Sequence, residues 1–369
     1  MLNNKFNDCP VLKIKNNNTI SVDDIELSNN TEIIFNGIHK LQSIFKGNID
    51  YCENWDKYRK NRDCNLFNTR NNKENIAYLD ICSRAYLKFT EMVHKYKLCD
   101  SKQINYLALA EAPGGFIEAF INYRIKDFSG RNDNIYTISL NDVVNKVPIY
   151  KLNNTHNFNI KFLSGKKQNG DLCDIENIKH IGITTKCNLI SADGGIDFSK
   201  NYNNQEHSIY KLLLCECVTA LTYNSTNGHF VLKIFDIHKQ KTIELIYLMS
   251  IFYKEVILFK PYISRNSNSE KYLICKSFLG ININILNKLY ETVQNYDNHS
   301  SILKIRIPTN YIKTIYDYNK VLLYKQITDI SHTILNMNHN YSDIIEKHII
   351  WCLKYDIPIN RKYLNNKLY

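Results

Sequence analysis

Long apolar runs are absent from this sequence of 369 residues. The most apolar stretch, residues 245–259, is interrupted by Lys254 and Glu255 and is too short to span a lipid bilayer. The first ten residues, MLNNKFNDCP, are mostly polar and lack the apolar segment of a secretory signal peptide. We therefore expect neither membrane association nor secretion.

Cysteine pairs with the spacing of a zinc site are also absent. The chain has 11 Cys, an odd number, and no Cys-x-x-Cys motif. Its one close pair, Cys215 and Cys217, is poorly spaced for zinc. Scattered cysteines of this kind are typical of reduced thiols, so we expect the protein in the cytoplasm or the nucleus.

Glycine and proline are scarce, with 12 Gly and 6 Pro, so the turn Pro113-Gly114-Gly115 stands out. The preceding residues 107–112 are small and apolar up to Ala112 except for Glu111, which suits a buried strand, and a helix is expected over 117–123. Glycines let a ligand approach the backbone, and the first N–H groups of a helix point toward it. In an open α/β sheet such a corner binds nucleotide-like ligands, although an ordinary strand-to-helix turn has the same pattern.

Positive charge exceeds negative charge in this chain. It contains 47 Lys and Arg against 36 Asp and Glu, a net charge of +11. This excess favours a polyanionic partner such as RNA, DNA or an anionic membrane surface. AT-rich genomes also raise the Lys content, and the chain is rich in Asn, Ile, Lys and Tyr. The charge alone therefore does not identify the partner.

Residues 1–75 are polar and Asn-rich and are interpreted as an N-terminal extension, with short strands expected at 11–14 and 32–35. Residues 57–73 hold six Lys or Arg against one acid. Cations that meet phosphates and rings that stack on bases suit a nucleic-acid surface, and a solvated basic loop has the same composition. The aromatic residues in or beside this segment are Trp55, Tyr58 and Phe67.

Strands and helices alternate from residue 76 onward, after a helix expected over 76–97. This alternation predicts an α/β fold with a mostly parallel sheet and helices on both faces. The last two strands are joined through 260–270 without a helix, so we expect an antiparallel pair at one edge of the sheet. The expected strands are 106–112, 134–140, 160–163, 188–192, 229–235, 255–259 and 272–275, and the later helices are 117–123, 174–180, 207–223 and 239–252.

The pattern becomes helical from about residue 281. The sequence thus predicts three parts: the extension 1–75, an α/β domain over 76–280 and a helical C-terminal region over 281–369. The C-terminal region has 11 Lys or Arg and 7 Asp or Glu, and it either adds to a nucleic-acid surface or covers the sheet. Its expected helices are 281–295, 309–316, 327–337 and 341–355.

Four segments combine apolar runs with polar residues in a fixed order. They are SRAYLK at 83–88, EAPGGF at 111–116, LISADGG at 189–195 followed by GHFVLKIFD at 228–236, and KPYISRNSNSEKYL at 260–273. Together they resemble the FtsJ/RrmJ-like S-adenosylmethionine-dependent RNA 2′-O-methyltransferases. The likeness is greatest to the cap-specific mRNA branch of eukaryotes and large DNA viruses. It covers roughly residues 76–280 and implies a Rossmann-like methyltransferase sheet.

The resemblance implies a catalytic tetrad of Lys88, Asp193, Lys233 and Glu270. Lys233 stands out without it, because a lysine inside the apolar strand FVLKIF is costly unless it is paired or functional. Taken singly, Lys88 reads as a solvated helix residue, Asp193 as a strand-end residue and Glu270 as a loop acid. In the tetrad Lys233 is the implied general base for a ribose hydroxyl. Lys88 would lower its pKa and the two acids would raise it, so the direction of the net shift is open.

The resemblance also implies S-adenosyl-L-methionine as the cofactor. The methionine part of the cofactor would lie against the turn at residues 113–116. Its adenine would contact Asp171 of the pair Gly170-Asp171. The ribose contact is less defined, because the second strand runs into Asn141 and Asp142, either of which could serve. The tetrad needs no metal, since each acid has a lysine partner. The other implied cofactor-binding residues are Glu111, Pro113, Gly114, Gly115, Phe116 and Asp193.

The implied substrate is capped mRNA, with other subunits of a capping apparatus as further partners. Ribosomal or transfer RNA is an alternative substrate, and a non-catalytic RNA-binding protein that keeps the fold is an alternative function. A DNA amino-methyltransferase is disfavoured, because no Asn/Asp-Pro-Pro-Tyr motif occurs. Residues that stack on the cap guanine are expected within 55–67 or 196–202. A viral member would work in the cytoplasm, in a viral factory or in the virion.

Overall fold

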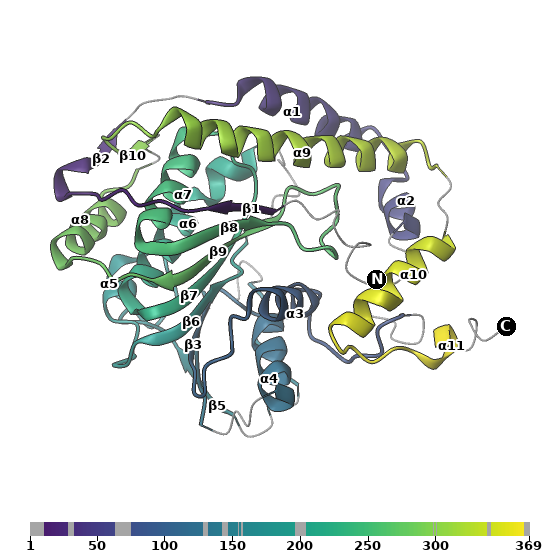
Figure 1. Cartoon of the computed structure of the whole chain (residues 1–369), viewed down its shortest axis with the longest axis horizontal. Coiled ribbons are helices and arrows are strands. Elements are labelled where there is room, and N and C mark those ends of the chain that lie inside the picture. The colour runs from purple at the N-terminus through teal and green to yellow at the C-terminus, as the bar shows by residue number, and fades with distance from the viewer. Residues whose placement is uncertain are drawn as a thin grey trace.

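The computed structural model describes residues 11–28, 33–62, 75–127, 132–141, 147–153, 155, 158–195, 204–297, 299, 301–337 and 341–364. Within these ranges lies one large sheet, and the two short strands β2 (Ile25–Ser28) and β10 (Ser301–Leu303) pair beside it. The strands of the large sheet are β1 (Val11–Ile14), β3 (Asn105–Leu109), β4 (Asn134–Ile138), β5 (Asn159–Leu163), β6 (Cys187–Ala192), β7 (Asn224–Ile234), β8 (Tyr253–Phe259) and β9 (Lys271–Phe278). Their order in space is β1-β8-β9-β7-β6-β3-β4-β5 (Figure 1).

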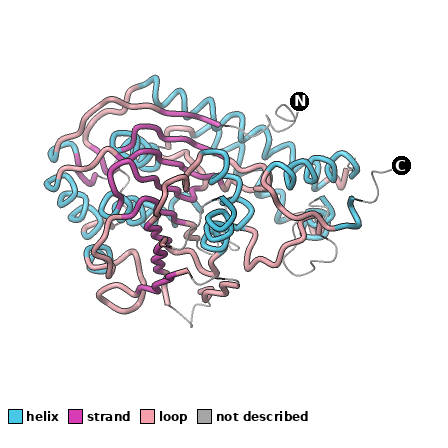
Figure 2. Tube along the Cα trace, turned by 60° about the horizontal axis from the view of Figure 1, so that its bottom comes forward, coloured by secondary structure: helices cyan, strands magenta, loops and turns pink. Residues whose placement is uncertain are grey.

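Helices flank this sheet on both sides (Figure 2). In the part of the chain that the structure describes, every helix is too short or too polar to cross a lipid bilayer. The helices are α1 (Asn36–Asp50), α2 (Trp55–Arg62), α3 (Ala85–Tyr96), α4 (Gly115–Asp127), α5 (Ile175–Lys179), α6 (Gln205–Tyr223), α7 (Gln240–Phe252), α8 (Ile283–Gln294), α9 (Thr309–Ile334), α10 (Tyr341–Lys354) and α11 (Arg361–Leu364).

Two hydrophobic cores lie on the two faces of the sheet. Successive side chains of a strand point to opposite faces, and β3 shows this clearly. Leu107 and Leu109 join the core formed with α6, α7, α8 and α9, whereas Tyr106 and Ala108 join the core formed with α3, α4 and α10. The small apolar residues of β3 are buried on both faces, as its sequence predicted.

The predicted mostly parallel sheet is confirmed. Strands β3, β4, β5, β6 and β7 run parallel to one another, and β9 lies between β7 and β8 and is antiparallel to both. The predicted antiparallel pair therefore exists, but it does not form the edge. Strand β1 from the N-terminal extension pairs antiparallel with β8 and occupies that edge. The boundaries predicted near residues 75 and 280 stay predictions, while segments beyond both of them pack on this sheet.

The predicted helix over 76–97 is wrong in its first part, because α3 begins only at Ala85. The preceding segment is not helical: Ala77 forms an isolated antiparallel bridge with Ile359, and its neighbours bond to the C-terminal region through their backbone groups. The Tyr78 N–H donates to the Pro358 carbonyl at 2.7 Å, and the Asn360 N–H donates to the Ile76 carbonyl at 2.8 Å. A contact with residues almost 300 positions later in the chain leaves no local sequence signal.

The strand predicted at 32–35 is also wrong for its described residues. Ile33 forms only an isolated bridge with Lys239, and the chain turns into α1 after Phe35. By contrast, the strand predicted at 11–14 is confirmed as β1. Of the basic segment 57–73, the structure describes residues up to 62, which belong to α2, and the remaining residues lie outside the described ranges.

Two predicted C-terminal helices, 309–316 and 327–337, are in fact one helix, α9, of 26 residues. It lies alongside α1 across the top of the molecule in Figure 1. The apparent gap between the two predictions contains Asn319 and Gln326, which are polar yet buried. Their amide groups donate to the carbonyls of Ile237 and Ser267, at 2.6 and 2.9 Å. Polar residues on the inward face hid the continuity of the helix.

We predict that the fold depends on the buried pair of Arg124 in α4 and Asp133 before β4. The guanidinium Nε lies 2.6 Å from the Asp133 carboxylate and its other nitrogens donate to three carbonyls, those of Cys99, Ser101 and Lys102. Replacing Arg124 by Leu should lower the free energy of unfolding by about 3–5 kcal/mol, because it leaves a buried charge unpaired. Urea unfolding measures this loss. The double variant Arg124→Leu/Asp133→Leu should lose less than Arg124→Leu alone, and an equal or greater loss would contradict the explanation.

Candidate active site

The carboxyl ends of β6 and β7 bring charged side chains together. In the β6–β7 ladder Ala192 is opposite Leu232, so the next residues, Asp193 and Lys233, are neighbours. In the β7–β9 ladder Lys233 is opposite Tyr272, which follows Glu270 by two positions. Pairing of the strands alone therefore assembles three of the four predicted catalytic residues.

Helix α3 supplies the fourth residue, Lys88, and two ion pairs result. The Lys88 Nζ lies 2.6 Å from Glu270 Oε1, and the Lys233 Nζ lies 3.4 Å from Asp193 Oδ1. Lys233 also donates a hydrogen bond of 2.7 Å to the Asp193 carbonyl oxygen. The four side chains are only 12% to 16% exposed. The structure thus places all four residues in one partly enclosed site.

Opposite charges in this site keep Glu270 and Lys233 charged, because they outweigh the effect of burial on the two pKa values. Burial by itself would raise the pKa of Glu270, but the positive charges of Lys88 and Lys233 outweigh it and lower that pKa to about 2. Burial by itself would lower the pKa of Lys233, but the charges of Asp193 and Glu270 outweigh it and raise that pKa above its ordinary value. The sequence left open whether the pKa of Lys233 is raised or lowered, and the structure shows that it is raised. Without cofactor or RNA, Lys233 therefore carries an ammonium group at neutral pH.

Two hydroxyl groups that sequence reasoning missed hold the acids in place. The Ser264 hydroxyl donates to Glu270 Oε1 at 3.1 Å, and the Tyr272 hydroxyl donates to Asp193 Oδ1 at 3.1 Å. Both residues belong to the segment 260–273 that the sequence analysis singled out. The position of Tyr272 opposite Lys233 in the sheet could have identified it, had the strand register been known.

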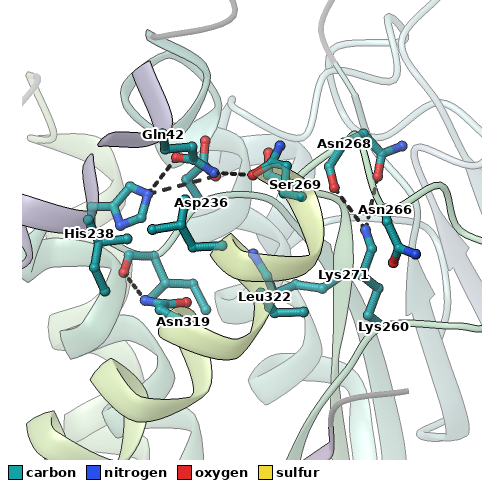
Figure 3. Close-up of a pocket in the computed structure, with 14 residues that line it drawn as sticks. Gln42, Asp236, His238, Lys260, Asn266, Asn268, Ser269, Lys271, Asn319 and Leu322 are labelled. Atoms are coloured by element: carbon teal, nitrogen blue, oxygen red, sulfur yellow. Dashed lines mark hydrogen bonds and ion pairs between the residues drawn. The ribbon is translucent and has the colours of Figure 1, made fainter. Parts of the chain in front are cut away.

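Figure 3 shows a buried polar cluster that includes Ser269 and Lys271, the two residues on either side of Glu270 in the chain. The Lys260 Nζ donates to the Glu270 carbonyl at 2.7 Å and to Asn268, and burial lowers its pKa to about 7. Next to it, Gln42 of α1 bonds to the His238 ring at 2.8 Å. A cavity of roughly 20 Å³ lies among these residues, about the space of one water molecule. Helices α1 and α9 both contribute to this cluster, so the two chain extensions support the segment that carries Glu270.

The predicted strand-turn-helix corner is confirmed between β3 and α4. Gly114 has a φ of +113°, which L side chains rarely adopt. A Cβ on Gly115 would collide with the Ser83 hydroxyl and with the backbone of α3 at Tyr86. The turn is fastened from outside by the Lys151 N–H, which donates to the Pro113 carbonyl at 2.9 Å. Gly114 is therefore required by its backbone conformation, and Gly115 by the close approach of α3 to the turn.

Two buried carboxyl groups near the turn lack ordinary partners in the described residues. Glu111 is 3% exposed, and neither of its oxygens accepts a hydrogen bond of normal geometry. Burial, and then the charge of Asp193, raise its pKa well above the usual range. Glu216 in α6 is 1% exposed, its Oε1 is also unpartnered, and it lies against Gly194. Sequence reasoning missed Glu216, and unpaired buried carboxyl groups suit a ligand that brings positive charge or N–H donors.

Three other residues predicted to bind the cofactor, Phe116, Asp171 and Asn141, lie at the carboxyl ends of β3, β5 and β4. The role of Phe116 stays a prediction, and its side chain is fully buried and stacks on Phe89 with 4.3 Å between ring centres. Only its backbone can face the turn. Asp171 accepts a hydrogen bond of 2.8 Å from the Cys173 N–H, and the Asn141 N–H donates to the Asn169 carbonyl at 2.8 Å. Asn141 therefore lies at the carboxyl end of β4, and Asp171 lies at that of β5. The other predicted residues, Asp142 and 196–202, lie outside the described ranges.

The fold and the site define an α/β protein with a nucleotide-type binding edge and two lysine–carboxylate pairs beside it. The sequence model of the FtsJ-like methyltransferase family matches residues 81–278, and the chain belongs to this family. The matched residues contain the glycine turn and all four members of the tetrad.

Three relatives show where the similarity lies. The cap-specific mRNA (nucleoside-2′-O-)-methyltransferase 2 of Drosophila melanogaster is 29% identical over 219 residues, which cover 56% of this chain and 31% of that protein. The corresponding methyltransferase 1A of Caenorhabditis briggsae is 32% identical over 182 residues, 44% of this chain and 21% of that protein. The cap-specific enzyme of Autographa californica nuclear polyhedrosis virus is 28% identical over 243 residues, 60% of this chain and 86% of that protein. The chain thus spans less than a third of the two animal proteins and most of the viral one.

We predict a pH-dependent contribution of the Lys88–Glu270 pair to stability. Because the pKa of Glu270 in the folded protein, about 2, is below its ordinary value of 4.5, the ionised carboxylate stabilises the fold above about pH 4.5, and this contribution is lost as the pH falls toward 2. Replacing Lys88 by Met should therefore reduce the free energy of unfolding most near neutral pH and progressively less in acid. Denaturant unfolding at several pH values measures the difference. Parallel curves for the two proteins would contradict the prediction.

Proposed function

We propose that this protein is an RNA 2′-O-ribose methyltransferase that acts on the first transcribed nucleotide of capped mRNA. One observation carries the proposal: the two lysine–carboxylate pairs lie at the carboxyl edge of the sheet beside Glu111, a buried and unpartnered acid that precedes the glycine turn. Membership of the FtsJ-like family supports the reaction, and the names of the relatives support the capped substrate.

S-adenosyl-L-methionine fits the residues at the carboxyl edge of the sheet. The unpartnered Glu111 carboxyl group, just before the glycine turn, suits its positively charged methionine part. Asp171 at the end of the loop after β5 suits its adenosine part. When bound, the cofactor supplies a methyl group on a positively charged sulfur, already activated for transfer to an oxygen nucleophile.

Lys233 is the proposed acceptor of the proton from the ribose 2′-hydroxyl group. In the protein alone its pKa is raised, so it holds a proton that it must lose first. Additional positive charge close to its Nζ lowers the pKa, because like charges disfavour the charged form. Lys88, held by Glu270, is already present in the protein alone, so the added charge would be the positively charged sulfur of bound S-adenosyl-L-methionine. Asp193 orients the Lys233 ammonium group through its carbonyl and carboxylate oxygens.

RNA as a partner is supported by the net charge of +11 and by the family. The described part of the basic segment, helix α2, contains Lys57 and Arg59 beside Tyr58. Further subunits of a capping apparatus, and a location in the cytoplasm or nucleus, also belong to this proposal. A 2′-O-methyltransferase for another class of RNA is the second candidate, since the same tetrad would serve any accessible ribose.

We predict that replacing Lys233 by Met abolishes methyl transfer while leaving the cofactor bound. The rate should fall at least ~100-fold, because the proton of the 2′-hydroxyl has no acceptor. Tritiated methyl transfer to short cap-0 RNA measures the rate, and calorimetry measures the cofactor. The matched control is Lys304→Met, which removes an exposed lysine whose only ion pair among the described residues, with Glu26, is long at 3.5 Å.

Comparison of two RNAs separates the candidate functions. Transfer to cap-0 RNA, with none to the same RNA already methylated on the first nucleotide, is the expected result. Equal transfer to both would indicate another nucleotide or another class of RNA. If the protein transfers no methyl group to either RNA but still binds RNA, the catalytic proposal is wrong and a binding role replaces it.

A further inference from the structure

The loop of residues 260–270 is fastened to α3 at both of its ends. It leaves β8, passes over α3 and returns into β9 immediately after Glu270. At its far end Lys88 of α3 holds the Glu270 carboxylate at 2.6 Å. At its near end the Tyr262 N–H donates to both oxygens of Glu91, at 3.2 and 3.0 Å. Lys88 and Glu91 are three residues apart, so they lie on the same side of the helix.

Glu91 also receives a donor from the C-terminal region. The indole Nε1–H of Trp351 in α10 donates to Glu91 Oε2 at 3.2 Å. Trp351 is fully buried, and Glu91 is 3% exposed. One carboxyl group thus joins the helix that carries Lys88, the loop that carries Glu270, and helix α10, which begins at Tyr341.

Burying the carboxyl group of Glu91 costs free energy. Burial raises the pKa of Glu91 to about 7, although the Tyr262 and Trp351 donors and the charges of Lys95 and Lys354 lower it. An apolar side chain of similar size would avoid that cost and would pack in the same core. What an apolar side chain cannot do is accept hydrogen bonds from the loop and from α10. The position therefore requires acceptor oxygens rather than volume.

We propose that Glu91 is a positioning residue for methyl transfer: by binding the Tyr262 N–H and the Trp351 indole, it sets the loop so that Glu270 meets Lys88. The inference rests on the proposed function of this site. It makes the C-terminal helix α10 a working part of the active site, although α10 lies outside the residues that match the family.

The first test uses two conservative variants. Glu91→Gln keeps the size but turns one acceptor into a donor that faces the Tyr262 N–H, and Trp351→Phe removes the indole N–H. Each should lower kcat about tenfold, because a small displacement of catalytic groups has a large effect on rate. The KM values for cofactor and RNA should change less than about twofold, since no binding group is removed. Unchanged kcat in both variants with lowered thermal stability would reduce Glu91 to a merely structural role.

Combining the two substitutions sharpens this test. If Glu91 and Trp351 act through one interaction, the double variant should be no slower than Glu91→Gln alone. Independent, multiplying effects would contradict the proposal. The matched control is Lys126→Met, which removes a different contact of the C-terminal region, the exposed Lys126–Asp356 pair of 2.6 Å, and should leave kcat unchanged.

The pH profile supplies a second readout. The ionised Glu91 carboxylate accepts all three hydrogen bonds, two from the Tyr262 N–H and one from the Trp351 indole. The ratio of wild-type kcat to Glu91→Gln kcat should therefore be largest at about pH 8, and it should approach one at about pH 6. Lys95 and Lys354 face Glu91 from α3 and α10, and His348 of α10 packs on the Tyr262 ring at 5.4 Å. These groups are present in both proteins, so their titration cancels in the ratio. A ratio that does not vary with pH would overturn the role assigned to the charge.

A measurement without catalysis separates this inference from the proposed function. Hydrogen exchange of the Tyr262 amide should accelerate at least ~tenfold in Glu91→Gln and stay unchanged in Lys126→Met. If the wild type transfers no methyl group but exchange of the Tyr262 amide accelerates in Glu91→Gln, the proposed function is wrong. The role of Glu91 in holding the loop 260–270 is then still supported. If the wild type is active and neither kcat nor exchange changes in Glu91→Gln, the inference alone is overturned.

Discussion

The position of Lys233 is the constraint on which the rest of this active site depends. A lysine next to the last residue of an internal strand must be neutralised or exposed. Here Asp193, Glu270 and the buried Glu216 surround it, and their combined attraction keeps it charged despite burial. Lys88 then balances Glu270, and hydroxyl groups of Ser264 and Tyr272 hold the acids in place. The site is therefore a network of mutually dependent charges rather than four separate catalytic groups.

The extensions on either side of the α/β domain contribute to the same network. Strand β1 completes one edge of the sheet, and α1 supplies Gln42 and Lys46 to the cluster around Asp236. Helix α9 adds Asn319 and Gln326 to that cluster, and α10 reaches α3 through Trp351. In Figure 1 these segments, from both ends of the chain, lie around the strands that carry the tetrad. The C-terminal extension thus reaches the loop between β8 and β9 directly, and the N-terminal extension reaches it through Gln326.

Sequence predicted the parts of this structure that depend on local pattern. The alternation of strands and helices gave the sheet, and Lys233 was conspicuous because it interrupts an apolar strand. The missed features depend on contacts between distant residues. Residues 76–78 are not helical because their backbone groups bond to the chain near Pro358, and α9 is continuous because its buried amides find partners in other segments. Glu91 and Glu216 looked like ordinary helix acids, since burial is not readable from one sequence. The direction of the Lys233 pKa needed the distances.

The most direct test of this account is the titration of the Lys233 amino group, followed by NMR of labelled lysine side chains. In the protein alone the account predicts a pKa above the ordinary 10.5, with the signal absent in Lys233→Met. Addition of S-adenosylmethionine should lower that pKa, because its sulfur is positively charged, whereas the neutral S-adenosylhomocysteine should lower it much less. A pKa below 10.5 in the protein alone, or the same response to both compounds, would contradict the central role given to charge balance in this site.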